Sequence, residues 1–272
     1  MNYPNAFSAA AALCAVVSAI PAHAIELNTL DLNISQNRLS FNTATFESRY
    51  VSLDASGTLT DRIGFELGAA SGTPSNARRG ASSIHRLSAA LTYDVNDMVE
   101  LGLYYDWGGY TWLTSHDTRT YGLQARLEHA DWRVNGYLGQ SDYGALGVTD
   151  KAKTFGLDVQ RRFGSRFAVG AYYDHESLSL ADLQRYGLTL DWRLTKPAAV
   201  PVTLRASAGQ HRLDGETSQN IALTLNIALK GDGRFDRGSF HPHSGFHDGF
   251  AITGLHSGPS APTYCELYDC DD

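Results

Sequence analysis

The sequence lacks long hydrophobic runs beyond its first residues, and it contains very little methionine. A membrane-spanning helix requires about 20 consecutive apolar residues, and no stretch after residue 24 approaches that length. A helical membrane protein is therefore excluded. The 272 residues include only 2 Met, whereas Gly and Tyr are frequent, with 26 and 14 residues. Tyr is common in strands, and this balance favours β structure.

Lysine and arginine are absent from the first 24 residues, which otherwise have the features of a secretory signal peptide. Residues 7–20 are small and apolar, and Pro21 and then Ala22-His23-Ala24 follow as an A-x-A type of cleavage site. A short buried helix is the alternative interpretation. Cys14 lacks the preceding small residues of a lipoprotein signal. We expect residues 1–24 to be removed on export, so that Ile25 begins the mature chain.

The strongest signal in the rest of the chain is an alternation of apolar and polar residues, which is typical of strands with one apolar face. In residues 121–128, Tyr121, Leu123, Ala125 and Leu127 occupy one face, while Gly, Gln, Arg and Glu occupy the other. The same alternation recurs in residues 132–138, 155–160, 186–194 and 221–229.

Short polar turns separate these runs at a regular interval. Their centres lie near residues 61, 96, 130, 165 and 198, which are 33 to 35 residues apart. Extended to both ends, this interval gives six hairpins, and therefore twelve strands, between residues 25 and 230. Helical repeats of this length would need an apolar period of 3.6, which is absent. Eight or ten strands is the alternative count, because the turn at Lys196–Pro201 is unusually rich in proline.

Longer connections rich in Gly, Ser, Asn and Asp alternate with the short turns. They are Ser71–Ser83, Gly108–Thr118, Ser141–Lys151 and Asp214–Gln219. Short turns at one end and longer loops at the other are typical of a transmembrane β-barrel with both termini on the short-turn side. We expect a single antiparallel up-and-down barrel, closed by pairing of its first strand, near Leu30, Leu32 and Ile34, with its last.

The polar face of the predicted strands carries charges of both signs, and this decides which face should line the lumen. A barrel of twelve strands is wider than side chains comfortably fill, and charges are costly in hydrocarbon. We therefore expect the polar face to point inward, in preference to a soluble sheet with an apolar interior. The predicted lumen-lining residues are Glu66, Arg86, Glu100, Arg126, Glu128, Arg133, Asp158, Asp191, Arg193 and Arg205. Glu128 and Arg133 flank one turn and should form a pair across it.

Large aromatic residues of the apolar face gather near the strand ends, as in the two interfacial girdles of membrane barrels. The band near the turns consists of Phe65, Tyr93, Trp132, Phe167 and Trp192. The band near the loops consists of Tyr105, Trp107, Tyr121, Phe155, Tyr173 and Tyr186. Between the bands this face is aliphatic, so it should contact lipid.

Taken together, residues 1–230 resemble Gram-negative outer-membrane β-barrel proteins, including small porin-like members. The resemblance concerns the architecture, so it transfers no catalytic or binding residue. It implies an outer-membrane location, lipid and the outer-membrane assembly machinery as partners, and no nucleic-acid partner. One feature departs from the pattern: the last strand ends in Ile227-Ala228-Leu229-Lys230, without the usual terminal aromatic.

Residues 231–272 form a tail of different composition, which we expect to be irregular, flexible and periplasmic. It has two Arg against seven Asp or Glu. Cys265 and Cys270 are the only mature cysteines and are candidates for a small disulfide loop. His241, His243 and His247 have a spacing that can bind a divalent metal. No fixed zinc spacing connects them to the cysteines, so we assign no metal site.

The predicted function is passive diffusion of small hydrophilic solutes through a lumen of mixed charge, with no cofactor and no enzymatic activity. The balance of Arg against Asp and Glu argues against strong anion selectivity. A non-conducting structural barrel, in which these charges pair into a plug, is the main alternative. A membrane-embedded lipid hydrolase using Ser83 and His85 on the outer face is less well supported, because no acidic or amide partner is evident. An adhesin acting through the loops is a further alternative.

Overall fold

The computed structural model describes residues 25–40, 45–74, 83–111, 115–145, 148–177, 182–195, 199–213 and 216–232. Outside these ranges lie the predicted signal peptide (1–24), Cys265, Cys270 and the tail histidines His241, His243 and His247. All regular structure within the ranges is β-strand. None of their residues belongs to a helix that is long and apolar enough to cross a membrane.

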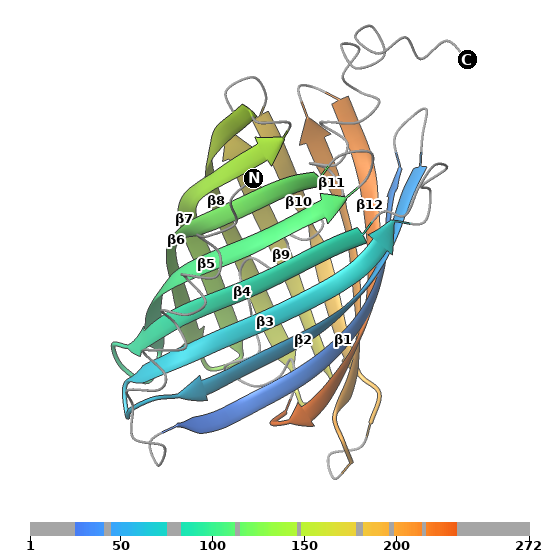
Figure 1. Cartoon of the computed structure of the whole chain (residues 1–272). Coiled ribbons are helices and arrows are strands. Elements are labelled where there is room, and N and C mark those ends of the chain that lie inside the picture. Colours follow the sequence, from blue (N-terminus) through green and yellow to red (C-terminus); the bar gives the residue numbers. More distant parts are fainter. Residues whose placement is uncertain are drawn as a thin grey trace, which may run out of the picture.

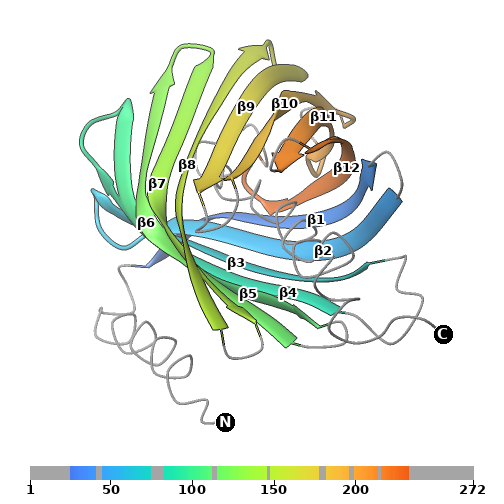
Figure 2. The same cartoon turned by 90° about the horizontal axis from the view of Figure 1, so that it is seen from above.

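Twelve antiparallel strands form one closed barrel, in which each strand pairs with its sequence neighbours and β1 pairs with β12 (Figures 1 and 2). Closure places Leu32 opposite Ile227 and Ile34 opposite Leu225, which confirms the predicted strand count and closing pair. The strands are β1 Glu26–Ser40, β2 Thr45–Thr58, β3 Ile63–Pro74, β4 Ser83–Asp94, β5 Val99–Thr111, β6 Ser115–His129, β7 Trp132–Ala145, β8 Val148–Phe163, β9 Phe167–Ser177, β10 Asp182–Arg193, β11 Val202–Leu213 and β12 Glu216–Lys230.

The short turns lie where the sequence predicts them, and local chemistry explains several of them. The side-chain oxygen of Asn96 accepts hydrogen bonds from the backbone N–H groups of Met98 and Val99, at 2.8 and 3.0 Å. This is how Asn commonly stabilises a tight turn. Gly164 and Ala130 adopt positive φ angles of 65° and 51°, which the two tightest reversals require. All five turns lie at the barrel end that contains the start of β1 and the end of β12.

The longer connections are shorter than the sequence predicts, because strand pairing continues well into the predicted loops. Thr111 pairs with Ser115, Ala145 with Val148, and Leu213 with Glu216. Pairing uses only backbone groups, so it does not require an apolar face. Beyond the apolar band both faces of these strands are polar, and the alternation that reveals the strands in sequence disappears there.

The side-chain distribution is inverted relative to a soluble protein. Inward-facing residues are polar and buried, as with Asn135 and Asp191, each only 1% exposed. Outward-facing residues are apolar and exposed, as with Leu188, which is 64% exposed, and Leu103, which is 60% exposed. This arrangement suits a barrel with an apolar environment outside and a polar interior.

Inward tyrosines lie against glycines of neighbouring strands, so the wall is thin where their rings pack. The hydroxyl of Tyr172 lies over Gly187 and Gly209. A Cβ added at Gly156 would overlap the ring of Tyr137 and a carboxylate oxygen of Asp174. These glycines are therefore required by close approach rather than by backbone conformation.

Replacing Gly156 with Ala should displace the Tyr137 ring and lower the thermal unfolding temperature of the folded barrel, because the interior cannot absorb the added methyl group without a shift. Unfolding can be followed in detergent by the mobility shift between folded and heated protein. Gly136→Ala is the matched control on the adjacent strand, since its nearest neighbour would be at 3.6 Å. Equal unfolding temperatures for the two variants would contradict the proposed packing.

Candidate functional site

The inner face of the barrel is the candidate site, and all ten predicted lumen residues lie on it. Their role in selectivity or closure stays a prediction. Even-numbered residues of β2 to β6, β8, β9 and β12 point inward, whereas odd-numbered ones do so in β1, β7, β10 and β11. Most of these polar side chains are buried, although they lie inside a wide barrel. The structure brings them together in several groups.

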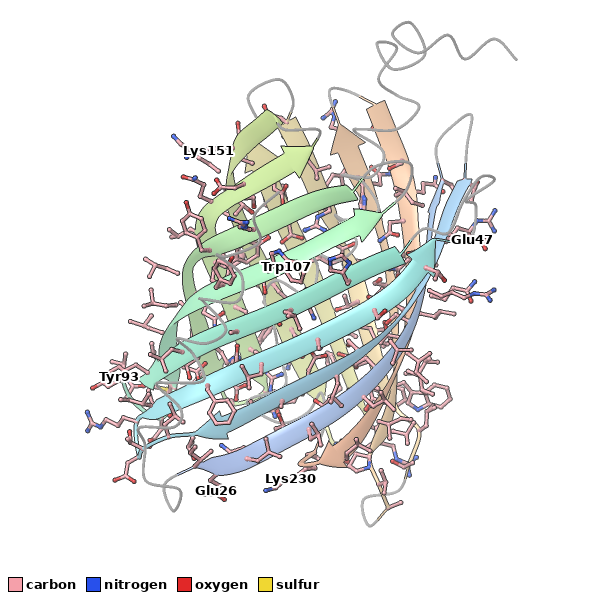
Figure 3. The ribbon with its side chains drawn as sticks, viewed as in Figure 1. Glu26, Glu47, Tyr93, Trp107, Lys151 and Lys230 are labelled. Atoms are coloured by element: carbon pink, nitrogen blue, oxygen red, sulfur yellow. The ribbon has the colours of Figure 1, made fainter. Side chains whose placement is uncertain are left out.

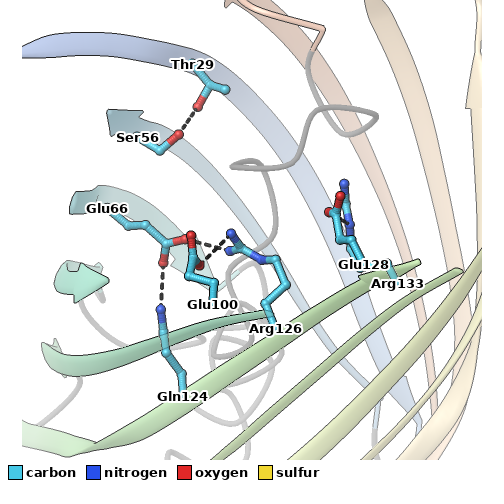
Figure 4. Close-up of polar contacts among 8 residues, drawn as sticks. All are labelled: Thr29, Ser56, Glu66, Glu100, Gln124, Arg126, Glu128 and Arg133. Atoms are coloured by element: carbon cyan, nitrogen blue, oxygen red, sulfur yellow. Dashed lines mark hydrogen bonds and ion pairs between the residues drawn. The ribbon is translucent and has the colours of Figure 1, made fainter. Parts of the chain in front are cut away.

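The first group surrounds Arg126 and joins strands that are not neighbours (Figure 4). The guanidinium of Arg126 on β6 donates to Glu66 on β3 at 2.6 Å and to Glu100 on β5 at 2.8 Å. Gln124 donates to the second oxygen of Glu66 at 3.1 Å. We call these four residues the Arg126 cluster. Because β4 and β5 lie between β3 and β6, the side chains lean along the inner wall to meet.

Glu128 and Arg133 form the ion pair predicted from their positions beside one turn. They face each other across the β6–β7 hairpin, and the Nε of Arg133 donates to Glu128 at 2.6 Å (Figure 4). This prediction is confirmed. The hairpin register alone explains it, since directly opposed residues of antiparallel strands lie within side-chain reach.

A second group crosses the seam where the barrel closes. Asp54 on β2 accepts hydrogen bonds from Asn33 at 2.7 Å and from Ser52 at 3.0 Å. Its other oxygen lies 3.5 Å from Arg86 on β4. Asn226 on β12 donates to Asn33 at 2.9 Å. This network links β12, β1, β2 and β4 and ties the first strand to the last from the inside.

Two further groups occupy the opposite wall. Asp191 on β10 accepts two hydrogen bonds from Arg205 on β11, at 2.7 and 2.6 Å. This bidentate geometry is the strongest form of such a pair. On β9, Asp174 accepts a hydrogen bond from the Tyr137 hydroxyl at 2.7 Å and lies 3.4 Å from Arg185.

Arg193 lies at the turn end of the lumen and contacts the chain just after the last strand. Its guanidinium lies 2.5 Å from the Asp232 carboxylate and 2.9 Å from the Asp232 carbonyl oxygen. Gly231, with a φ of 81°, immediately follows β12. The left-handed conformation turns the chain there toward the inner face.

Sequence reasoning missed six charged residues of the inner face. They are Asp31, Asp54, Asp106, Asp174, Glu176 and Arg185, and all are buried. Five of these six are acidic. The predicted set has equal numbers of acidic and basic residues, but with the six additional residues the inner face has more acidic than basic residues. Asp106 stands out because neither of its oxygens accepts a hydrogen bond within the described chain. The signal was available, since each of the six has the inward parity of its strand.

The predicted aromatic bands lie on the outer face, near the two ends of the strands. Tyr93 marks the turn end in Figure 3. The rings of Phe167 and Trp192 stack at 6.2 Å near the turns, where Arg161 also lies 5.3 Å from the Trp132 ring centre. Near the loops, Tyr186 donates to Gln210 at 2.6 Å. Their role at a membrane interface stays a prediction.

On the described outer face, the side chains are not arranged as the hydrolase alternative requires. His85 packs against the Trp107 ring, with centroids 5.0 Å apart, and the side chain of Ser83 is not among those described. His175 lies 3.7 Å from Asp182 and stacks on Phe155. Within the described chain, no serine hydroxyl is hydrogen-bonded to either histidine. The same ranges contain no group of three His, Cys, Asp or Glu residues arranged to hold a metal ion.

Comparison with known proteins identifies the architecture of the chain. No protein-family model and no curated protein matches it. An outer-membrane channel from Pseudomonas putida F1 superposes with a TM-score of 0.51 at 13% identity, covering 77% of this chain and 99% of that chain. The KdgM porin gives 0.49 at 11% identity, covering 72% and 98%. The translocator domain of the autotransporter NalP from Neisseria meningitidis gives 0.49 at 12%, covering 82% and 95%. At these identities the likeness shows the fold alone, and that fold is the one of outer-membrane β-barrels.

The Arg126 cluster gives a direct test of the inner network. Arg126→Gln should lower the free energy of unfolding by about 3 kcal/mol, because it leaves two carboxylates without their shared cation in a poorly solvated site. The measurement is denaturant unfolding of the barrel in detergent. The double variant Glu66→Gln/Arg126→Gln should recover part of the loss, since it removes both partners. A double variant at least as unstable as Arg126→Gln would contradict the pairing.

Proposed function

We propose that the protein is a porin-like channel of the outer membrane, which lets small hydrophilic solutes and ions diffuse through a narrow lumen. The observation that supports this proposal is the polar, charged inner face of a closed barrel whose outer face is apolar. We further propose that a cleaved signal peptide exports the chain and that the outer-membrane assembly machinery inserts it. The inner-face residues that the structure describes form ion pairs and hydrogen bonds that suit a pore wall, so our proposal does not include an enzymatic activity.

The inner network would make this channel restrictive. Arg126 reaches from β6 toward β3, and Arg86 reaches from β4 toward β2. Such ion pairs keep the side chains close to the wall. Because the paired side chains are buried, they expose little surface to water in the lumen. A solute would have to exchange its hydration for contacts with these charges. We therefore expect small conducted species and a conductance well below that of wide porins.

The charge of the inner face favours cations. The inner face carries the acidic residues Asp31, Asp54, Asp106, Asp174 and Glu176 in addition to the five predicted from sequence, whereas among the buried residues that the structure describes Arg185 is the one arginine beyond the predicted set. Rings and patches of carboxylates raise the local concentration of cations in a pore. This acidic excess supports a modest cation preference, whereas the ten residues predicted from sequence alone indicate balanced charge.

A non-conducting structural barrel is the second candidate, and the burial of the ion pairs favours it. If the inner side chains and their bridges leave no continuous aqueous path, the same network serves as a plug that stabilises the wall. The two functions differ in a single measurable property, which is the passage of ions.

Single-channel recording in planar lipid bilayers tests the proposal. The wild-type protein should give small, uniform current steps, and a KCl gradient should give a reversal potential of the sign that indicates cation preference. The variant Asp191→Asn should weaken this preference, because it removes the carboxylate that pairs with Arg205 and leaves the positive charge of that arginine on the inner face.

Controls separate a closed lumen from an unfolded barrel. The mobility shift of folded protein must be present in every sample that is recorded. If the wild type is folded and gives no steps, while Glu66→Gln/Arg126→Gln does give steps, the network is a plug. If folded wild type and variant are both silent, the channel proposal is wrong.

A further inference from the structure

The loop end of β6, β7 and β8 carries a group of cations on the outer face of the barrel. Arg119 on β6 and Lys151 and Lys153 on β8 are exposed and face outward. Their positions are set by the strand register, which places Asp142 of β7 between Arg119 and Lys151. Figure 3 shows Lys151 at the loop-end edge, pointing away from the barrel. We call Arg119, Lys151 and Lys153 the outer cationic patch.

The height of this patch follows from the aromatic residues below it. Lys153 lies two residues beyond Phe155, and Arg119 lies two residues beyond Tyr121, on the same outward faces. A two-residue step along a strand is about 6.6 Å. Further down, the same region is aliphatic, with Leu123 directly opposite Leu138. Because exposed aromatics mark the membrane–water interface in barrels, the patch lies at the level of lipid headgroups.

The described side chains of this region have a net positive charge. Among the side chains that the structure describes there, Asp142 is the carboxylate that lies between the cations, and it also accepts a hydrogen bond from Gln140 at 2.9 Å. Elsewhere on the loop-end outer face, as far as the structure describes it, the cations are fewer. Arg38 on β1 lies directly opposite Glu47 on β2. The described outer face of β6 to β8 is therefore the place where an anion would be held most strongly.

We propose that the outer cationic patch binds the phosphate group of an anionic lipid in the membrane leaflet at the loop end. Arg and Lys side chains are the usual donors to phosphate. The aliphatic strand faces immediately below would contact the acyl chains of the same lipid, which free phosphate cannot do. This inference rests on the proposed membrane location but not on conduction through the lumen.

The test uses the full-length folded protein in phosphatidylcholine nanodiscs, with and without lipid A that carries two phosphate groups. The thermal unfolding temperature should rise with lipid A in the disc, and native mass spectrometry should show bound lipid A. Each charge removed from the patch should weaken binding about fivefold. The triple variant Arg119→Gln/Lys151→Gln/Lys153→Gln should therefore lose nearly all of the stabilisation.

Two comparisons make the result specific. Arg38→Gln/Arg49→Gln, which removes loop-end cations from β1 and β2, should bind lipid A like the wild type. Inorganic phosphate in lipid-A-free discs should give no stabilisation. The proposal is overturned if the triple variant binds as well as the wild type, if both variants lose binding equally, or if inorganic phosphate stabilises the protein as much as lipid A. If the wild-type protein conducts no ions in bilayer recordings, its binding of lipid A is unaffected. The channel proposal and the lipid-binding proposal can therefore be tested independently.

Discussion

Closure of the sheet is the constraint on which the rest of this structure depends. A strand in contact with hydrocarbon must have every backbone N–H and C=O paired, so a spanning sheet has no free edge. Here β1 pairs with β12 along most of its length, and the Asn33–Asn226 hydrogen bond reinforces the seam from the inside. Once the sheet is closed, alternate side chains are forced into two environments, one inside the barrel and one outside.

The inner environment has its own requirement, because buried charges need partners. The barrel meets it with arginines that reach carboxylates one or more strands away, as Arg126 does with Glu66 and Arg86 with Asp54. The inner face uses arginine rather than lysine, which suits bidentate pairing with carboxylates. Tyrosines complete the packing by lying over glycines. The same network that stabilises the wall also limits what can pass through it.

Most of the architecture could be predicted because a strand with one apolar and one polar face has an exact sequence period. The turn at Asn96 and the Glu128–Arg133 pair needed only local positions and register. The loop ends could not be predicted, because backbone pairing between Thr111 and Ser115 leaves no apolar alternation to detect. Asp174 and Glu176 were missed although they have inward parity, since the Tyr172-Tyr173 pair beside them obscures which face is apolar.

The sequence by itself determined a twelve-strand barrel, its closing pair, and which end contains the short turns, because all three follow from periodicity and chain order. Only the tertiary structure decided which inner charges meet. Glu66 and Arg126 are 60 residues apart, and their contact depends on the tilt and curvature of a closed wall. The grouping of Arg119 with Lys151 and Lys153 was decided in the same way. Sequence gives each residue its face, whereas the register between strands gives it its neighbours.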